Sequence, residues 1–310
     1  MKALLFPGQG SQIVGMGSDF YNEFNEVKEI FEMADNVLKF KISKIILEGP
    51  ENELKLTQNT QPAIMTVSYA IFSVLKKHFN LDLKSFKFLA GHSLGEYSAL
   101  VCSNSLRFED ALYLLYERGK AMQESVPVGQ GAMLAVLGCN LEEINNCLDK
   151  INTTGVCEIA NDNANGQIIM SGNIKKINDL QYQLKTVKKK SILLPVSAPF
   201  HCTLMKSASE VMKDKIMKIV FKNPANEIVS NVTATSERAP EVIKRLLVEQ
   251  IYSKVRWRES ILFMKNNGVN EFFEIGPGKV LSGLIKRIMK EAKSFNINTI
   301  DDAKKFSNEL

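Results

Sequence analysis

The sequence has few of the features on which several large protein classes depend. Its five cysteines are odd in number, scattered and without a Cys-x-x-Cys pair, which argues against a zinc site of that type and a disulfide framework. No apolar run approaches the roughly 18 residues of a membrane helix. The first apolar segment meets Pro7 too early for a secretory signal peptide. We therefore expect a cytoplasmic protein that neither enters membranes nor holds a metal.

An excess of charge of one sign is missing too. Lys+Arg number 39 and Asp+Glu 34, a net charge of +5 that does not suggest a dedicated nucleic-acid binder but suits acidic partners. The 45% hydrophobic and 24% charged fractions are ordinary for a globular enzyme. Because 310 residues exceed a typical domain of about 100–200, we expect two domains or one domain with an insert.

Strands and helices alternate along most of the chain, which predicts a mainly parallel sheet covered on both faces. A helix is expected from Thr60, as its cap, through Pro62 in the first turn to about His78. The last dozen residues are polar, and we expect them to be loosely held. Other strands are predicted at 3–6, 86–90, 227–231 and 272–275, and other helices at 95–102, 109–124, 204–219, 240–252 and 280–289.

Residues 128–197 follow a different order. Strands at 132–137, 156–160, 167–170 and 191–196 and helices at 141–151 and 174–186 give β-α-β-β-α-β, the ferredoxin-like unit. Asn165-Gly166 predicts a hairpin turn between the two middle strands. We predict an inserted domain at 128–197 and a larger catalytic domain formed by 1–127 and 198–310.

A serine between two glycines follows one predicted strand and precedes a helix. Gly91-His92-Ser93-Leu94-Gly95 fits a nucleophile elbow, in which glycines allow a sharp turn that exposes the serine hydroxyl. The helix that follows offers free N–H groups to an oxyanion. The alternative is an ordinary strand–helix turn in which Ser93 only caps the helix.

A serine nucleophile needs a base, and the chain has three histidines. His92 adjoins Ser93, and consecutive side chains on such a turn point apart. His78 lies at a helix end, where capping explains it. His201 remains, on a turn between a strand and a helix, although a solvent-facing turn histidine is the alternative.

Arg118 shares the apolar stripe of its helix with Leu114, Leu115 and Met122. An inward-facing arginine requires an anion, and its planar fork suits a carboxylate. That carboxylate is either a buried glutamate or part of a substrate. Two apparent nucleotide motifs fail, because Ile13 replaces the third glycine of one and Val280 the Ser or Thr of the other.

Several motifs together resemble the malonyl-CoA:acyl carrier protein transacylases of fatty-acid synthesis, an acyltransferase family. The resemblance covers nearly the whole chain. The motifs are FPGQGSQ at 6–12, TQPA at 60–63, GHSLGEY at 91–97, ERGKAMQ at 117–123, NGQIIMSG at 165–172, PFH at 199–201 and EIGPGKVLSGL at 274–284.

The resemblance implies an α/β-hydrolase-like core with a mainly parallel sheet and a ferredoxin-like insert. It makes Ser93 the nucleophile that carries the malonyl group and His201 its general base. The backbone carbonyl of Gln250 would orient the histidine, and the backbone N–H groups of Gln12 and Leu94 would form the oxyanion hole.

The resemblance further makes Arg118 the clamp for the malonyl carboxylate. Substrate-binding roles would fall to Phe200, typical of malonyl use, and to Met122, Met133 and Asn163. Asp162 departs from the usual apolar or aromatic residue and leaves the local loop packing in question. Malonyl-CoA, coenzyme A and acyl carrier protein are the implied partners of an expected monomer, without a cofactor.

Two other functions are compatible with parts of the pattern. A serine esterase or thioesterase could use the same elbow, but it would not need an inward arginine. The second is a catalytically silent module that binds carrier protein. The joint presence of Ser93, His201 and Arg118 argues against it. Because carrier proteins are usually acidic, Lys188–Lys190, Arg256 and Arg258 are candidate docking residues, although a solvated face also explains the lysines.

Overall fold

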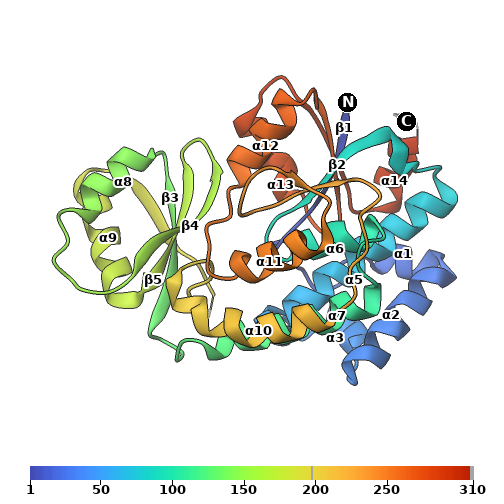
Figure 1. Ribbon diagram of the computed structural model, residues 1–310, viewed down its shortest axis with the longest axis horizontal. Coiled ribbons are helices and arrows are strands. Elements are labelled where there is room, and N and C mark those ends of the chain that lie inside the picture. The colour runs from blue at the N-terminus through green and yellow to red at the C-terminus, as the bar shows by residue number, and fades with distance from the viewer. Residues whose placement is uncertain (197, 308–310) are drawn as a thin grey trace.

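Two sheets organise the chain in the computed structural model, which describes residues 1–196 and 198–307 (Figure 1). The larger has the order β10-β9-β1-β2-β7-β8, and all its pairs are parallel except β7 with β8. The predicted mainly parallel α/β fold is therefore confirmed. Its strands are β1 (Lys2–Phe6), β2 (Phe86–Gly91), β7 (Glu227–Val229), β8 (Ser236–Glu237), β9 (Glu271–Ile275) and β10 (Lys293–Ile297).

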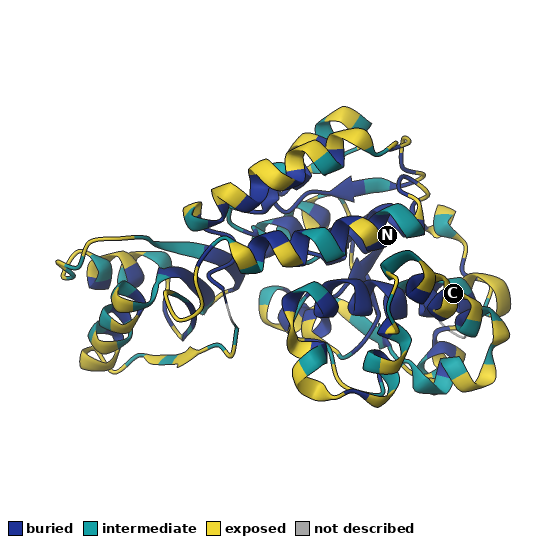
Figure 2. Cartoon of the chain, turned by 90° about the horizontal axis from the view of Figure 1, so that it is seen from below, coloured by how far each residue is buried: buried dark blue, intermediate teal, exposed yellow. Residues whose placement is uncertain are grey.

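The alternation of side chains along buried strands creates two separate cores, one on each face of this sheet. In β1, Leu4 and Phe6 pack into one core with α2, α5, α6 and α7, whereas Ala3 and Leu5 pack into the other with α12 and α13. Figure 2 shows buried residues in the sheet and exposed ones on the outer sides of the helices. The helices are α2 (Asn25–Leu38), α5 (Thr57–His78), α6 (Gly95–Cys102), α7 (Phe108–Glu124), α12 (Trp257–Asn266) and α13 (Val280–Ile288).

The smaller sheet is antiparallel and has its own core with two helices, at the left of Figure 1. Its order β4-β5-β3-β6 and the chain order β-α-β-β-α-β are those of the predicted ferredoxin-like unit. Residue 197 lies outside the described residues, and the domain boundaries stay predictions. The elements are β3 (Gly131–Leu137), α8 (Leu141–Leu148), β4 (Cys157–Ala164), β5 (Gln167–Asn173), α9 (Ile174–Thr186) and β6 (Lys190–Leu193).

Asp162 lies in a strand rather than in the loop expected from the sequence. Strand β4 continues to Ala164 because its pairing with β5 persists up to the Asn165-Gly166 turn. The Asp162 carboxylate is buried, and Arg258 of α12 donates to both of its oxygens at 2.7 to 3.1 Å. The backbone N–H of Asp162 also donates to the carbonyl of Val255. The unusual residue thus joins the small sheet to the larger core.

The helix expected from Thr60 begins at Thr57, so Thr60 is not its cap. The Thr60 hydroxyl instead donates to the backbone carbonyls of Leu54 and Leu56, and the Asn59 amide donates to that of Glu53. These contacts with the preceding turn of chain extend the helix backward. Pro62 is consequently inside the helix rather than in its first turn.

The expectation of loosely held C-terminal residues is wrong for residues 300–307. They form α14 (Ile300–Ser307), in which Ala303 and Phe306 are buried, and residues 308–310 lie outside the described residues. The Phe306 ring contacts Phe273 of β9 edge-on. The remaining helices are α1 (Ser18–Glu23), α3 (Ile42–Glu48), α4 (Glu51–Lys55), α10 (Lys206–Lys218) and α11 (Pro240–Gln250). Across the described ranges, no helix is both long and apolar enough to cross a membrane.

Candidate active site

Ser93 lies on a sharp turn between β2 and α6, at the carboxyl end of the parallel sheet. A Cβ on Gly91 would fall 1.9 Å from the backbone of Gly95, and one on Gly95 would fall 2.3 Å from the carbonyl oxygen of Phe6. Both glycines are therefore required by close backbone approach. The left-handed φ of 54° falls on Ser93 itself. Such strain in a non-glycine residue is typical of a nucleophile elbow.

Asn231, which lies two residues after the end of β7, holds this turn in place. Its side-chain oxygen accepts a hydrogen bond of 2.7 Å from the backbone N–H of Ser93, and its amide donates to the carbonyl of Gly91 at 2.8 Å. The residue is fully buried. The sequence does not predict this role, although Asn231 falls at the end of the strand predicted at 227–231.

Replacing Asn231 with alanine is expected to destabilise the fold by about 1–3 kcal/mol. The substitution leaves buried backbone groups of the elbow without partners, and each such loss costs an amount of this order. Chemical denaturation measures the change, with Asn36→Ala on the exposed side of α2 as a control that is expected to change little. An equal stability for Asn231→Ala and the control would contradict this account of the elbow.

The Ser93 hydroxyl and the His201 imidazole are in contact, with 2.8 Å between Oγ and Nε2. On the other side of the ring, Nδ1 lies 2.9 Å from the backbone carbonyl of Gln250. A carbonyl only accepts, so Nδ1 carries the hydrogen and Nε2 presents its lone pair to Ser93. Gln250 ends α11, where carbonyls lack helical partners. The carbonyl at the end of α11 thus lies against the ring nitrogen that a carboxylate contacts in a Ser-His-Asp triad.

The environment keeps the His201 ring uncharged. Burial, and then the nearby positive charge of Arg118, lower the pKa of His201 to about 3. The side chains of the other two histidines have partners other than Ser93, in agreement with the elimination of both as the base. His92 donates from Nε2 to Asn163 at 2.8 Å and faces Trp257, and His78 pairs with Glu26 rather than capping its helix.

Arg118 reaches the same serine from α7 and is 1% exposed. Its Nη2 donates to Ser93 Oγ at 3.1 Å and to the Gln250 side-chain oxygen at 2.9 Å, while Nη1 donates to Gln61 at 2.7 Å. Its Nε is buried without a partner. No carboxylate in the described part of the chain forms an ion pair with it, so the guanidinium is available to an incoming anion.

A glutamate lies near Arg118, separated from it by one side chain. The Gln250 amide donates to Arg118's neighbour Glu96 at 2.8 Å, and the backbone N–H of Asn231 donates to the same carboxylate oxygen at 3.1 Å. Burial raises the pKa of Glu96 to about 7. A buried glutamate as a direct partner of Arg118 was one of the two predicted alternatives; in the structure the Gln250 side chain lies between Arg118 and Glu96.

The other predicted site residues are buried or lie beside the elbow. Leu94 directly precedes α6, and the turn that contains Gln12 packs against the elbow, where a Cβ on Gly8 would fall 2.5 Å from the His92 carbonyl oxygen. The Asn163 side-chain oxygen is engaged by His92. Phe200, Met122 and Met133 are 6%, 2% and 4% exposed and share the larger core. Their roles toward substrate stay predictions.

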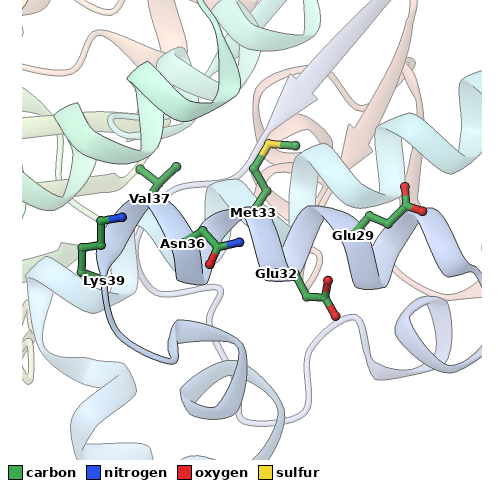
Figure 3. A pocket seen from close by; sticks show the side chains of 6 residues that line it. All are labelled: Glu29, Glu32, Met33, Asn36, Val37 and Lys39. Carbon is green, nitrogen blue, oxygen red and sulfur yellow. The ribbon is translucent and has the colours of Figure 1, made fainter.

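Two hollows away from the elbow contain none of these residues. One of about 530 Å³ lies over α2 and is lined by Glu29, Glu32, Met33, Asn36, Val37 and Lys39 (Figure 3). Another, of about 690 Å³, lies beside the β4–β5 hairpin and includes the pair formed by Asp162 and Arg258. Among the residues that the structure describes, no group of three or more His, Cys, Asp or Glu side chains is placed to hold a metal ion.

Comparison with known proteins agrees with this geometry. The acyl transferase domain family matches residues 3–304. The chain is 43% identical to the malonyl CoA-acyl carrier protein transacylase of Bacillus subtilis over 96% of its own length and 93% of that relative. This chain belongs to the malonyl CoA-acyl carrier protein transacylases. A Staphylococcus aureus transacylase is 41% identical over 97% of both chains.

Solved structures of transacylases share the fold almost entirely. The acyl-carrier-protein S-malonyltransferase of Bartonella henselae has a TM-score of 0.96 at 41% identity, with 99% of this chain and 98% of that one covered. A malonyl-transacylase in complex with its type II PKS acyl-carrier protein also has a TM-score of 0.96, at 36% identity over 100% and 99%. The transacylase fold therefore extends over both sheets of this chain.

Proposed function

We propose that this enzyme moves the malonyl group of malonyl-CoA to the phosphopantetheine thiol of acyl carrier protein through an ester on Ser93. One observation carries the proposal. The Ser93 oxygen lies 2.8 Å from His201 Nε2 and 3.1 Å from Arg118 Nη2, so that a nucleophile, its base and a carboxylate-binding group meet at one atom. The reaction belongs to fatty-acid synthesis, and we place it in the cytoplasm.

In the first half-reaction, Ser93 Oγ attacks the thioester carbonyl while His201 Nε2 accepts the hydroxyl proton. The bond to sulfur then breaks, and His201 returns the proton to the departing coenzyme A thiolate. The Gln250 carbonyl, which accepts from Nδ1, keeps the ring aligned through both proton transfers. We assign stabilisation of the oxyanion to the backbone N–H groups of Leu94 and Gln12.

In the second half-reaction, the thiol of the carrier protein gives its proton to His201 and its sulfur attacks the malonyl ester. Collapse of the intermediate breaks the bond to Ser93 Oγ, which takes the proton back from His201. Arg118 binds the free carboxylate and thereby selects diacid over neutral acyl groups. Phe200, Met122, Met133 and Asn163 complete the proposed acyl site. Because serine carries the acyl group, the scheme uses no cofactor.

We propose a monomer that docks the carrier protein through exposed basic residues. Lys188 and Lys190 are exposed. Arg256 and Arg258, in contrast, pair with Glu259 and Asp162. Ion pairing leaves these arginines less charge to offer an acidic partner, so the lysines are the better candidates of the sequence analysis.

Transfer and hydrolysis are distinguished by following the malonyl group. With holo carrier protein, we expect malonyl-carrier protein to form much faster than free malonate, and without it we expect the malonyl ester on Ser93 to persist. Mass spectrometry of both proteins and chromatography of malonate measure the two fates. Rapid release of malonate at the same rate with and without carrier protein would instead identify a thioesterase.

The rate of Ser93 acylation is expected to be flat between pH 5 and pH 8. His201 has a pKa of about 3 because of burial, so the basic form persists well below the ordinary histidine value of about 6.5. Rapid-quench acylation by malonyl-CoA measures this profile. The lowered pKa of His201 also makes the free energy of unfolding fall as the pH decreases from about 6.5 toward 3. In this range the unfolded chain binds a proton on His201 that the folded chain does not bind. A halving of the acylation rate near pH 6.5 would contradict the assignment.

A further inference from the structure

Glu96 is a buried carboxylate that the proposed mechanism does not use. It is the second residue of α6, directly after the elbow, and is 2% exposed. It has no ion-pair partner among the residues described by the structure. A carboxylate buried in this way is costly unless hydrogen bonds satisfy it. Its two donors are the Asn231 backbone N–H and the Gln250 side chain, both of which belong to the surroundings of Ser93.

The Gln250 side chain links this carboxylate to Arg118. Its oxygen accepts from Arg118 Nη2 at 2.9 Å, and its nitrogen donates to Glu96 at 2.8 Å and to the Ser93 carbonyl at 3.1 Å. A guanidinium only donates, and carboxylates and carbonyls accept, so this amide orientation is the one that satisfies all three neighbours. Glu96 thus fixes the end of Gln250 that faces the arginine.

We propose that Glu96 is a positioning residue for substrate selection: through the Gln250 amide it holds the Arg118 guanidinium beside Ser93, where the free carboxylate of a diacid acyl thioester binds. The inference rests on the proposed function, because it takes Arg118 as the carboxylate clamp. It adds a residue that touches no substrate yet determines how strongly malonyl is preferred over acetyl.

The position of the accepting oxygen, rather than its charge, matters for this role. Both hydrogen bonds go to Oε2, and no described residue donates to Oε1. Burial also raises the pKa of Glu96 to about 7, so the uncharged form is accessible near neutrality in the presence of its neighbours Arg118 and Tyr97. Glu96→Gln keeps an accepting oxygen in reach of Gln250. Glu96→Asp keeps the acid but withdraws the oxygen by one methylene.

The two variants make a matched test. For each, kcat/KM is measured for acylation of Ser93 by malonyl-CoA and by acetyl-CoA. We expect the malonyl-to-acetyl ratio to fall by about ten-fold in Glu96→Asp, the size of one intramolecular hydrogen bond, and to stay within about two-fold of the parent in Glu96→Gln. Glu109→Asp, on the surface of α7, is the control and leaves the ratio unchanged. A merely structural role for Glu96 would lower both reactions in parallel, and that result overturns the proposal.

Repeating Glu96→Asp in an Arg118→Ala background separates the inference from the function on which it rests. If Glu96 acts through Arg118, the second change lowers the ratio no further. If Arg118→Ala alone leaves the ratio unchanged, the clamp itself is wrong; if it lowers the ratio and Glu96→Asp does not, only the role of Glu96 is wrong. Should Glu96→Asp fail to fold, Gln250→Ala removes the same link, and an unchanged ratio in that variant equally overturns the inference.

Discussion

Replacing Ser93 with alanine is expected to abolish the malonyl-enzyme and to reduce malonyl transfer to carrier protein by about 10⁴-fold or more. Both His201 and Arg118 form hydrogen bonds with the Ser93 hydroxyl. The variant therefore loses the nucleophile while both of its partners remain. Intact mass spectrometry after brief mixing with malonyl-CoA measures the covalent species directly.

Ser98→Ala provides the matched control for this experiment. Ser98 lies on α6, the helix that follows the Ser93 turn, and its buried hydroxyl has no hydrogen-bond partner among the described residues. Its removal is therefore expected to leave acylation unchanged. A malonyl adduct that forms on Ser93→Ala as fast as on the parent protein would mean that another residue carries the acyl group.

Replacing Arg118 with alanine is expected to lower the malonyl-to-acetyl preference by about 30-fold or more. Removing one partner of a buried charge pair costs about 2–5 kcal/mol, and only the diacid substrate forms that pair. Because Arg118 also donates to Ser93 Oγ, the absolute rates with both substrates are expected to change. The ratio isolates the contribution of the substrate carboxylate.

Competition between malonyl-CoA and acetyl-CoA for Ser93, followed by mass spectrometry, gives this ratio in one mixture. Arg118→Lys is expected to be intermediate, since a lysine keeps the charge without the planar fork. Arg107→Ala, an exposed arginine beside the start of the same helix, is the control. Equal malonyl preference in Arg118→Ala and the control would remove the clamp from the mechanism.

Local patterns were sufficient to predict the elements that form the elbow. The strand before Ser93 and the helix after it were predicted with nearly the observed bounds, because an apolar run, two glycines and helical spacing all lie within one short segment. His201 followed by elimination among three histidines. The helical spacing of the apolar residues predicted that Arg118 points inward. It did not predict the side-chain amides of Gln61 and Gln250 as its partners.

Features that depend on distant segments could not be predicted in the same way. Asn231 lies 138 residues from the Ser93 backbone N–H that it binds, and Gln61 lies 57 residues from the Arg118 guanidinium that it binds. Nothing in the local sequence of either residue marks these contacts. The early start of α5 is likewise due to hydrogen bonds with the preceding turn. Asp162 in strand β4 is unusual in the sequence, but its partner Arg258 lies 96 residues away on helix α12.

Gln250 contributes to the site through its main-chain carbonyl and its side-chain amide, and a substitution changes only the amide. Its main-chain oxygen contacts His201 Nδ1, and any residue that preserves the end of α11 supplies the same oxygen. Its side chain contacts the arginine instead. If Arg118 selects the substrate as proposed, substitutions at position 250 are expected to alter which acyl units are accepted while the main-chain contact with His201 is kept.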